Sequence, residues 1–354
     1  MKRATIVRLD PSFPEEGHLK EAADIIRAGG LVIIPTETVY GIAVNMLNKK
    51  AVERLSKIKQ RPKDKPFSLH IYKKETVDEF ASDISVYAYK LMERFWPGPL
   101  TLVFKSKDRS GTIGIRLPEN EIAFKVIARS QVPVVCPSAN LPGAPAPVNF
   151  QDAIKDLEGL VDFAIDAGPT EIGKESTVVD VSGPAAKILR EGAISPRVIC
   201  DTASRKAVLF VCTGNSCRSV MAEGLFEKML KQKGRGDVDV YSAGIMMVGG
   251  LGATEQTKEV LARQGVDVSD HVSQRVTRDL INSSDLILAM ETLHVEKILQ
   301  IAPEAKNRVF LLKEFAKISD GGLEIEDPIG RSMEFYEMTL DTIKQAVERI
   351  IDII

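Results

Sequence analysis

The chain has 354 residues, of which 44% are hydrophobic and 27% charged, and its formal net charge at pH 7 is −2. This composition is that of a globular protein, and it lacks the overall basic field that draws many proteins to nucleic acid. No apolar run approaches the roughly 18 residues of a membrane span, and the first ten residues lack the apolar core of a signal peptide. The length predicts two domains. Four cysteines, two of them in one loop, favour a reducing compartment, the cytoplasm, without membrane contact.

The first half of the chain alternates short apolar runs with polar loops of irregular length. These runs predict strands at residues 31–35, 100–104, 113–116, 132–136, 176–181 and 186–190, and the pattern over 49–60 predicts an amphipathic helix. Such a spread favours an α/β domain with a twisted mixed sheet and flanking helices. The short Pro-containing connection at 191–205 is the expected boundary, which places one domain at 1–195 and a second at 206–354.

Polar side chains follow several of these strands and are candidates for binding phosphate or ribose. Five cations stand within nine residues: Lys57, Lys59, Arg61, Lys63 and Lys65. Together they suit a polyphosphate, although the same residues taken alone also fit a solvated helix end. Ser138 and Asn140 follow an apolar strand, where side chains and free amides can bind a nucleotide or form a plain turn. No Walker loop or dinucleotide fingerprint occurs, so a standard P-loop site is not expected.

Six short motifs occur in order through this half: PTETVYG at 35–41, KxR with KP and His over 59–70, TIGIR at 112–116, PSAN at 137–140, ESTVVD at 175–180 and ILR at 188–190. Together they resemble the YrdC/Sua5 family of threonylcarbamoyl-AMP synthases, over about residues 10–195. The resemblance implies condensation of L-threonine, bicarbonate and ATP with release of pyrophosphate, which starts N6-threonylcarbamoyladenosine formation in tRNA. It also implies tRNA, or the tRNA-modifying threonylcarbamoyl transferase machinery, as a partner.

The same resemblance implies a role for individual residues. Four match positions that hold threonine: Thr38, His70, Arg116 and Ser176. Seven match positions around ATP: Lys59, Arg61, Lys65, Thr112, Ser138, Asn140 and Arg190. Arg116 is expected to pair with the threonine carboxylate in a bidentate geometry that lysine cannot copy. Mg²⁺ is expected on the ATP phosphates, held by substrate and water, with no metal site of protein ligands and no tightly bound cofactor. The alternative is a module that binds RNA or a nucleotide without synthase activity.

The second half opens on VLFVCTGNSCRSVMAE at residues 208–223, which reads as strand, loop and helix. The apolar run predicts a buried parallel strand that ends at Cys212, and Arg218 opens an amphipathic helix. A five-residue loop between them can curl round a phosphate-sized anion, with backbone N–H groups inward and the helix N-terminus adding favourable potential. In that setting Cys212 is a thiolate nucleophile and Arg218 a bidentate phosphate ligand. A buried structural cysteine beside a surface arginine is the alternative.

The loop CTGNSCRS, the segment YSAG at 241–244, the strand at 285–290 and the pair Asp327-Pro328 resemble the low-molecular-weight protein tyrosine phosphatases. The resemblance covers about residues 206–354 and implies a four-stranded parallel, doubly wound α/β domain acting on a phosphoprotein. It implies that Cys212 is the nucleophile, Arg218 the phosphate clamp and Asp327 the general acid. Asp327 by itself is also compatible with a solvated acidic turn. The implied loop supports are Thr213, Gly214, Asn215, Ser216, Cys217, Ser219, Ser242 and His271.

Two departures from the family pattern concern the substrate. Ile329 stands where the family usually places an aromatic residue that packs on a phosphotyrosine ring, and Ser216 is polar, as in bacterial protein-arginine phosphatases of this family. Phosphoarginine and phosphotyrosine therefore both stay open, as does a phosphoprotein trap or redox sensor. Arsenate reduction is not expected, because it needs further cysteines and none follows Cys217.

Overall fold

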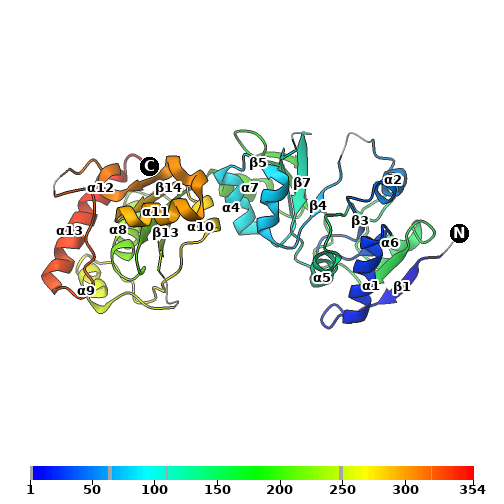
Figure 1. Cartoon of the computed structure of the whole chain (residues 1–354), viewed down its shortest axis with the longest axis horizontal. Helices are drawn as coiled ribbons and strands as arrows, with labels where there is room; N and C mark the ends of the chain where they lie inside the picture. Colours follow the sequence, from blue (N-terminus) through cyan, green and yellow to red (C-terminus); the bar gives the residue numbers. More distant parts are fainter. Residues whose placement is uncertain (1–2, 63–65, 109–110, 247–249, 320) are drawn as a thin grey trace. The chain divides into compact units, whose positions relative to one another are not determined.

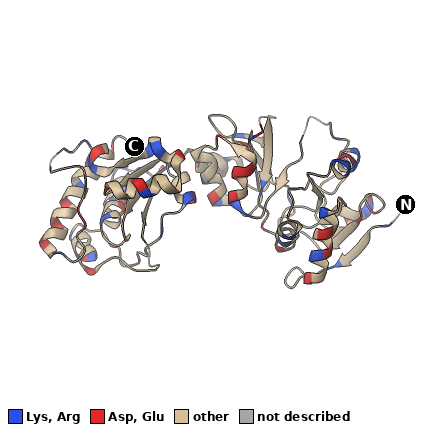
Figure 2. Cartoon of the chain, viewed as in Figure 1, with Lys and Arg blue, Asp and Glu red and all other residues tan. Residues whose placement is uncertain are grey.

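The computed structural model describes residues 3–62, 66–108, 111–246, 250–319 and 321–354, and the chain divides into two compact units (Figure 1). The first unit ends at Ala203 and the second begins at Ser204. Positive and negative side chains are interspersed on the helices of both units, in keeping with the small net charge (Figure 2). No helix in the described ranges combines the length and the apolar character needed to cross a membrane.

The first unit is built on one mixed sheet, as the irregular strand spacing predicted. Its strands are β1 Thr5–Arg8, β2 Val32–Ile34, β3 Gly41–Asn45, β4 Leu69–His70, β5 Ala81–Ser82, β6 Leu100–Ser106, β7 Thr112–Arg116, β8 Val134–Val135, β9 Phe163–Asp166, β10 Thr177–Asp180 and β11 Lys187–Arg190. They pair in the order β1-β9-β2-β3-β8-β4-β7-β6-β10-β11, and β5 pairs with β6. The sheet contains both parallel pairs, such as β4 with β7, and antiparallel pairs, such as β2 with β3. All six strands expected in this half are present.

Helices cover both faces of this sheet, because neighbouring strand residues point to opposite sides. They are α1 Glu16–Arg27, α2 Lys49–Ile58, the 3₁₀ turn η1 Lys74–Thr76, α3 Val77–Phe80, α4 Val86–Phe95, α5 Glu121–Ser130, α6 Phe150–Lys155 and α7 Pro196–Ser204. Along β2, Val32 and Ile34 pack with α1 and α5, whereas Ile33 packs with α2 and α6. A third apolar cluster lies under α4, where Leu91 joins Leu102 of β6. These clusters fix the strand ends that carry the polar motifs.

The segment 191–205, expected as a short connection between domains, instead contains helix α7. Its Ile199 is fully buried in the cluster under α4, and its Thr202 hydroxyl accepts a hydrogen bond of 2.8 Å from Arg94 Nη1. Pro196 suits the first helical position, where an N–H group has no partner within the helix. Nearly all of the expected connection therefore packs with the first compact unit, which ends at Ala203.

The second unit has a four-stranded parallel sheet, which confirms the expected fold. Its strands are β12 Lys206–Cys212, β13 Val238–Gly244, β14 Leu286–Ala289 and β15 Val309–Leu311. They pair in the order β13-β12-β14-β15, and every pair is parallel. β12 is an unbroken apolar run because both faces of a parallel sheet are covered. Its end at Cys212 lies between β13 and β14, at the carboxyl edge where sheets of this kind bind ligands.

The helices of this unit pack on both faces of that sheet, as a doubly wound fold requires. They are α8 Arg218–Gln232, α9 Glu255–Arg263, α10 Arg278–Asn282, α11 Thr292–Ile301, the 3₁₀ helix η2 Pro303–Arg308, α12 Leu312–Phe315 and α13 Met333–Ile350. On one face Phe210 of β12 packs with Phe226 of α8 and with α13. On the other face Leu209 and Val211 pack with Ile298 of α11. The loop after β12 is thus held between two rigid layers.

Candidate active sites

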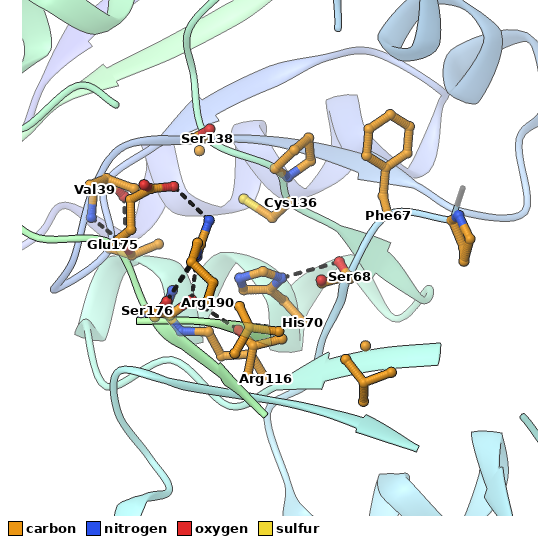
Figure 3. A pocket seen from close by; sticks show the side chains of 18 of the residues that line it. Val39, Phe67, Ser68, His70, Arg116, Cys136, Ser138, Glu175, Ser176 and Arg190 are labelled. Carbon is orange, nitrogen blue, oxygen red and sulfur yellow. Dashed lines mark hydrogen bonds and ion pairs between the residues drawn. The ribbon is translucent and has the colours of Figure 1, made fainter. Parts of the chain in front are cut away.

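The first unit contains a cavity of about 500 Å³ whose wall gathers residues from several motifs (Figure 3). The expected site residues that line it are His70, Arg116, Ser176, Lys59, Arg61, Thr112, Ser138 and Arg190. Thr38 and Asn140 do not line the cavity but contact residues that do. Lys65 lies outside the described residues. Motifs that are far apart in the sequence therefore meet in one cavity.

Arg116 lies at the end of β7, and two of its three guanidinium nitrogens donate hydrogen bonds to protein groups. Nη2 donates to Glu37 Oε1 (2.5 Å) and to Thr38 Oγ1 (2.8 Å), and Nε donates to the Gly98 carbonyl oxygen (3.2 Å). Nη1 has no hydrogen-bond partner among the residues that the structure describes. The bidentate pairing expected from the sequence does not fit this geometry, because a single nitrogen is left for a ligand carboxylate.

His70 lies beside Arg116 in the cavity wall as a neutral imidazole (Figure 3). Nδ1 donates to the Ser68 carbonyl oxygen at 3.4 Å, so Nε2 is the nitrogen that keeps a lone pair. Burial, and next the charge of Arg116, lower the pKa of His70 to about 3. His70 can therefore accept a hydrogen bond from a hydroxyl or amine group of a ligand at neutral pH.

The lowered pKa of His70 predicts that acid destabilises the first unit. The unfolded chain binds this proton near pH 6.5 and the folded unit only near pH 3, so stability present above pH 6.5 is lost as the pH falls toward 3. Trp96, the single tryptophan, is buried in this unit, and its fluorescence in urea titrations reports unfolding. Between pH 7 and pH 5 we expect His70 to account for a loss on the order of 1–2 kcal/mol in the free energy of unfolding, which His70→Gln removes. An equal loss in both proteins would contradict this role.

The part of the cavity wall around Ser138 is organised by Lys59. Its Nζ donates to the carbonyl oxygens of Ser138 (3.0 Å) and Asn140 (2.7 Å) and to Asn140 Oδ1 (2.9 Å). Ser138 Oγ in turn donates to Asn140 Oδ1 at 2.7 Å. Burial, and next the nearby charge of Arg61, lower the pKa of Lys59 to about 8. The Ser-Ala-Asn turn is thus anchored by the basic cluster rather than being an isolated turn.

Two further arginines of the wall, Arg61 and Arg190, each have partners within the protein, and Arg61 Nη2 donates to the Pro66 carbonyl oxygen at 2.7 Å. The Arg61 guanidinium carbon lies 4.9 Å from the centroid of the Phe67 ring. Arg190 donates through Nη1 to Glu175 Oε1 (2.6 Å) and through Nη2 to the Ser176 carbonyl oxygen (2.9 Å) and to Ser176 Oγ (3.1 Å). A phosphate that binds Arg190 would therefore meet a guanidinium group that is already paired with Glu175.

Within the described ranges, no three His, Cys, Asp or Glu side chains are grouped to hold a metal ion. Glu175 is the one carboxylate among the described residues that line the cavity. Mg²⁺ prefers oxygen ligands, keeps several waters and is commonly bound through substrate phosphates. With a single carboxylate in this wall, most ligands of a Mg²⁺ ion there would have to come from a bound phosphate group and water.

In the second unit, the loop after β12 bends around the Cys212 sulfur. Sγ lies 2.9 Å from Ser219 Oγ and accepts a hydrogen bond from the Asn215 backbone N–H at 3.3 Å. Asn215 has φ of 53°, a left-handed conformation that asparagine tolerates better than most residues. A Cβ on Gly244 would lie 2.8 Å from the Thr213 carbonyl oxygen, so the close approach of β13 to the loop requires glycine. Gly214, Ser216 and Cys217 complete the loop.

Asn215 is the centre of the hydrogen bonds that hold this loop. Its Nδ2 donates to Ser219 Oγ (3.0 Å) and Ser242 Oγ (2.8 Å), and its Oδ1 accepts from the Gln274 backbone N–H (2.8 Å). Its carbonyl oxygen accepts from His271 Nε2 at 2.8 Å. The structure thus brings Ser242 and His271 to Asn215, and it adds Gln274, which the motif did not indicate.

The Arg218 side chain is 1% exposed and faces the loop from the first turn of α8. Nη1 donates to Glu291 Oε2 (2.6 Å) and to the Ile325 carbonyl oxygen (2.7 Å). Nη2 donates to Asp327 Oδ2 (2.6 Å) and to Thr213 Oγ1 (3.2 Å). The structure therefore places Cys212, Arg218 and Asp327 at one site, and an incoming phosphate competes with carboxylates for the guanidinium group.

Each unit matches a family model. The Sua5–YciO–YrdC model, whose description reads telomere recombination, matches residues 24–192, and the low molecular weight phosphotyrosine protein phosphatase model matches residues 207–354. A putative threonylcarbamoyl-AMP synthase of Mycobacterium tuberculosis is 33% identical over 200 residues, which are 54% of this chain and 91% of the relative. A protein-arginine-phosphatase of Bacillus subtilis is 36% identical over 143 residues, 40% of this chain and 93% of the relative. The chain belongs to both families.

These matches confirm the two resemblances drawn from the motifs. A threonylcarbamoyl-AMP synthase of Pyrococcus abyssi is 40% identical over 188 residues, which are 51% of this chain and 55% of the relative. The chain thus spans little more than half the length of that synthase. The shared part is the Sua5-type unit, which contains the cavity.

The phosphatase-family unit also contains residues in contact with this loop or with Arg218 that the motif did not reveal. His294 Nδ1 accepts from the Glu291 backbone N–H (3.0 Å), so Nε2 donates to Thr213 Oγ1 (3.0 Å). Burial, and next the charge of Arg218, lower the pKa of His294 to about 4, which keeps the ring neutral. Glu291 directly follows the strand expected at 285–290, and a polar residue at that strand end is the signal that could have found it.

Glu223 of α8 extends the Asn215 network. Ser242 Oγ donates to Glu223 Oε2 at 2.6 Å. Burial raises the pKa of Glu223 to about 7, against the opposing effect of the Ser242 hydrogen bond. A hydrogen-bonded chain of side chains therefore runs from Cys212 through Ser219 and Asn215 to a carboxyl group that titrates near neutrality.

Proposed function

We propose that this chain is a bifunctional enzyme in which an L-threonylcarbamoyl-AMP synthase is joined to a cysteine-dependent protein phosphatase. The synthase proposal rests on the one cavity that gathers Lys59, Arg61, Arg116 and Arg190 around neutral His70. Such a wall suits a ligand set with several phosphates and one carboxylate. The relatives named as threonylcarbamoyl-AMP synthases support a threonylcarbamoyl adenylate as the product. We propose L-threonine, bicarbonate and ATP as the substrates, with release of pyrophosphate. We propose functional domains at 1–195 and 206–354.

In the proposed reaction the synthase unit acts by positioning and charge neutralisation. Arg116 Nη1 receives the threonine carboxylate, and His70 Nε2 accepts a hydrogen bond from threonine. The threonine amine takes up CO₂ from bicarbonate, and the bicarbonate hydroxide leaves with an amine proton as water. The resulting carbamate oxygen attacks the α-phosphorus of ATP while pyrophosphate leaves. Arg61 and Arg190 face the phosphates, and Mg²⁺ bound to ATP supplies further positive charge.

The product of this reaction carries an activated threonylcarbamoyl group. We propose that it is passed on for N6-threonylcarbamoyladenosine formation in tRNA, with tRNA or the threonylcarbamoyl transferase machinery as partner. ATP is a substrate of the cell interior, and the thiolate chemistry of Cys212 needs a reducing compartment. The cytoplasm is the compartment that we propose.

The proposed phosphatase reaction proceeds by a covalent intermediate. Cys212 Sγ attacks phosphorus, Asp327 gives a proton to the leaving group, and the phosphate stays on sulfur. Water then attacks the phosphocysteine with Asp327 as base, which releases phosphate and restores the thiolate. Arg218 exchanges its contacts with Asp327 and Glu291 for phosphate oxygens, and this exchange frees Asp327 to act on the leaving group.

We propose phosphoarginine in proteins as the preferred substrate. Ser216 lies in the loop with its Oγ 3.7 Å from Cys217 Sγ, and it offers a polar group next to the bound phosphate. Ile329 follows the Asp-Pro pair and is 55% exposed, so no aromatic ring at that position can stack on a phosphotyrosine ring. The protein-arginine-phosphatase relative supports this choice.

Replacing Ser216 by isoleucine is expected to shift the ratio of phosphotyrosine to phosphoarginine hydrolysis toward phosphotyrosine by about tenfold, because an apolar side chain replaces a polar contact. The measurement is kcat/KM on matched phosphoarginine and phosphotyrosine peptides. Ile329→Phe provides an aromatic surface without changing the loop and is expected to act in the same direction. An unchanged ratio in both variants would exclude this basis of substrate choice.

A further inference from the structure

The ion pair between Glu37 and Arg116 is buried behind the cavity. The two side chains are 0% and 5% exposed, and the residues are 79 positions apart in the sequence. Removing two charges from water costs much free energy, and it is tolerated where each group finds further hydrogen bonds. Glu37 does not line the cavity, although its ion-pair partner does. Arg116 therefore connects the Glu37 carboxylate to the cavity.

Glu37 is fixed by a second set of contacts on the side away from Arg116. Its Oε2 accepts hydrogen bonds from the backbone N–H groups of Glu119 (3.2 Å) and Asn120 (3.4 Å), just before α5. Backbone groups at a helix start are rigid donors that favour a negative charge. The carboxylate is thus tied to the end of a helix, and it holds Arg116 in a fixed position relative to that helix.

Thr38 completes the support of Arg116. Thr36 Oγ1 donates to the Val39 carbonyl oxygen (2.6 Å), so at the 2.9 Å contact between the two threonines Thr38 Oγ1 is the donor. Because the Thr38 hydroxyl hydrogen points to Thr36, Thr38 Oγ1 acts as the acceptor of the 2.8 Å hydrogen bond from Arg116 Nη2. Both Nη2 hydrogens and the Nε hydrogen of Arg116 are accordingly used by the protein.

We propose that Glu37 is a positioning and selectivity residue for the threonine carboxylate. It fixes the Arg116 guanidinium so that Nη1 alone is offered to a ligand, and it offsets the positive charge there. A carboxylate with one charge can still bind through a directed hydrogen bond, whereas a phosphate with more charge is repelled by Glu37. Glu37 thereby keeps pyrophosphate and the ATP phosphates at Arg61 and Arg190. This inference rests on the proposed synthase function.

The test measures ligand binding to the full chain by calorimetry, with wild type, Glu37→Gln and the surface control Glu53→Gln. For Glu37→Gln we expect the Kd for L-threonine to rise at least about tenfold while the Kd for ATP changes less than about twofold. We also expect pyrophosphate to compete with threonine in Glu37→Gln but not in wild type. Unchanged threonine binding, or an equal loss for ATP, would overturn the inference. Wild type that binds no threonine would instead reject the synthase function itself.

A second pair of variants covers the case in which Glu37→Gln does not fold, as reported by Trp96 fluorescence. Arg116→Met and Glu37→Gln/Arg116→Met both lack the arginine, and the double variant removes both buried charges. If Glu37 acts through Arg116, the double variant folds, binds ATP and binds threonine no more weakly than Arg116→Met. A further loss of threonine affinity in the double variant would show that Glu37 acts on threonine by another route.

Discussion

Replacing Cys212 by serine is expected to lower phosphoester and phosphoramidate hydrolysis by about 10⁴-fold or more, because a serine hydroxyl in this loop lacks the nucleophilicity of a thiolate. The loop itself should persist, since a hydroxyl can still accept the Asn215 N–H and meet Ser219. Threonine-dependent release of pyrophosphate from ATP should be unchanged, because that chemistry is assigned to the other unit. Steady-state assays of both reactions on one preparation give the result.

Cys200→Ser is the matched control for that variant. Cys200 is an exposed cysteine of α7 and takes no part in either proposed site, so both activities should stay at the wild-type level. Hydrolysis by Cys212→Ser at the wild-type rate would show that Cys212 is not the nucleophile. Equal losses in the two variants would point to general damage by loss of a thiol.

Replacing Arg61 by alanine is expected to lower the threonine-dependent release of pyrophosphate by about 100-fold. Arg61 lines the cavity, and its loss removes charged hydrogen bonds to phosphate together with the stacking on Phe67. The loss should appear mainly as weaker ATP binding, while the KM for threonine changes little. Phosphatase activity should be unaffected.

Lys57→Ala separates this role from the general effect of positive charge. Lys57 belongs to the same group of cations but does not line the cavity. We expect its loss to change pyrophosphate release less than about twofold, as is usual for exposed charges. If both variants lost activity to the same extent, the basic cluster would be acting as a diffuse field rather than through Arg61.

Most of the fold could be predicted from patterns formed by residues close together in the sequence. The strand that ends at Cys212, the loop and the helix from Arg218 could be inferred because one short segment contains both the apolar run and the polar loop. The mixed sheet of the first unit followed from its six apolar runs. Such features depend on residues close in the sequence, where periodicity and turn chemistry are informative.

The partners of the key arginines could not be predicted in the same way. Arg116 meets Glu37 at 79 positions' separation, and Arg218 meets Glu291 at 73. Each glutamate follows an expected strand, but the sequence does not indicate which arginine it will meet, because the pairing arises only when distant segments come together in the fold. The expected bidentate use of Arg116 failed for this reason, since Glu37 and Thr38 already occupy Nη2.

Helix α7 shows that amino-acid composition is a weak guide to the position of a domain boundary. The segment 191–205 contains a proline and no strong helix pattern, and a connection was the natural interpretation. Burial of Ile199 against the cluster under α4 stabilises the helix there. Helix α7 is therefore stabilised by tertiary packing, since the helix propensity of the segment alone does not predict it.

The most direct test of the central claim is to measure pyrophosphate release from ATP by the purified Cys212→Ser protein. Threonine and bicarbonate are each omitted in turn. The account predicts release only when ATP, threonine and bicarbonate are all present, at the wild-type rate and with no measurable phosphatase activity. Release that ignores threonine, or no release from a folded protein that still binds ATP, would contradict a synthase and would leave the first unit as a binding module.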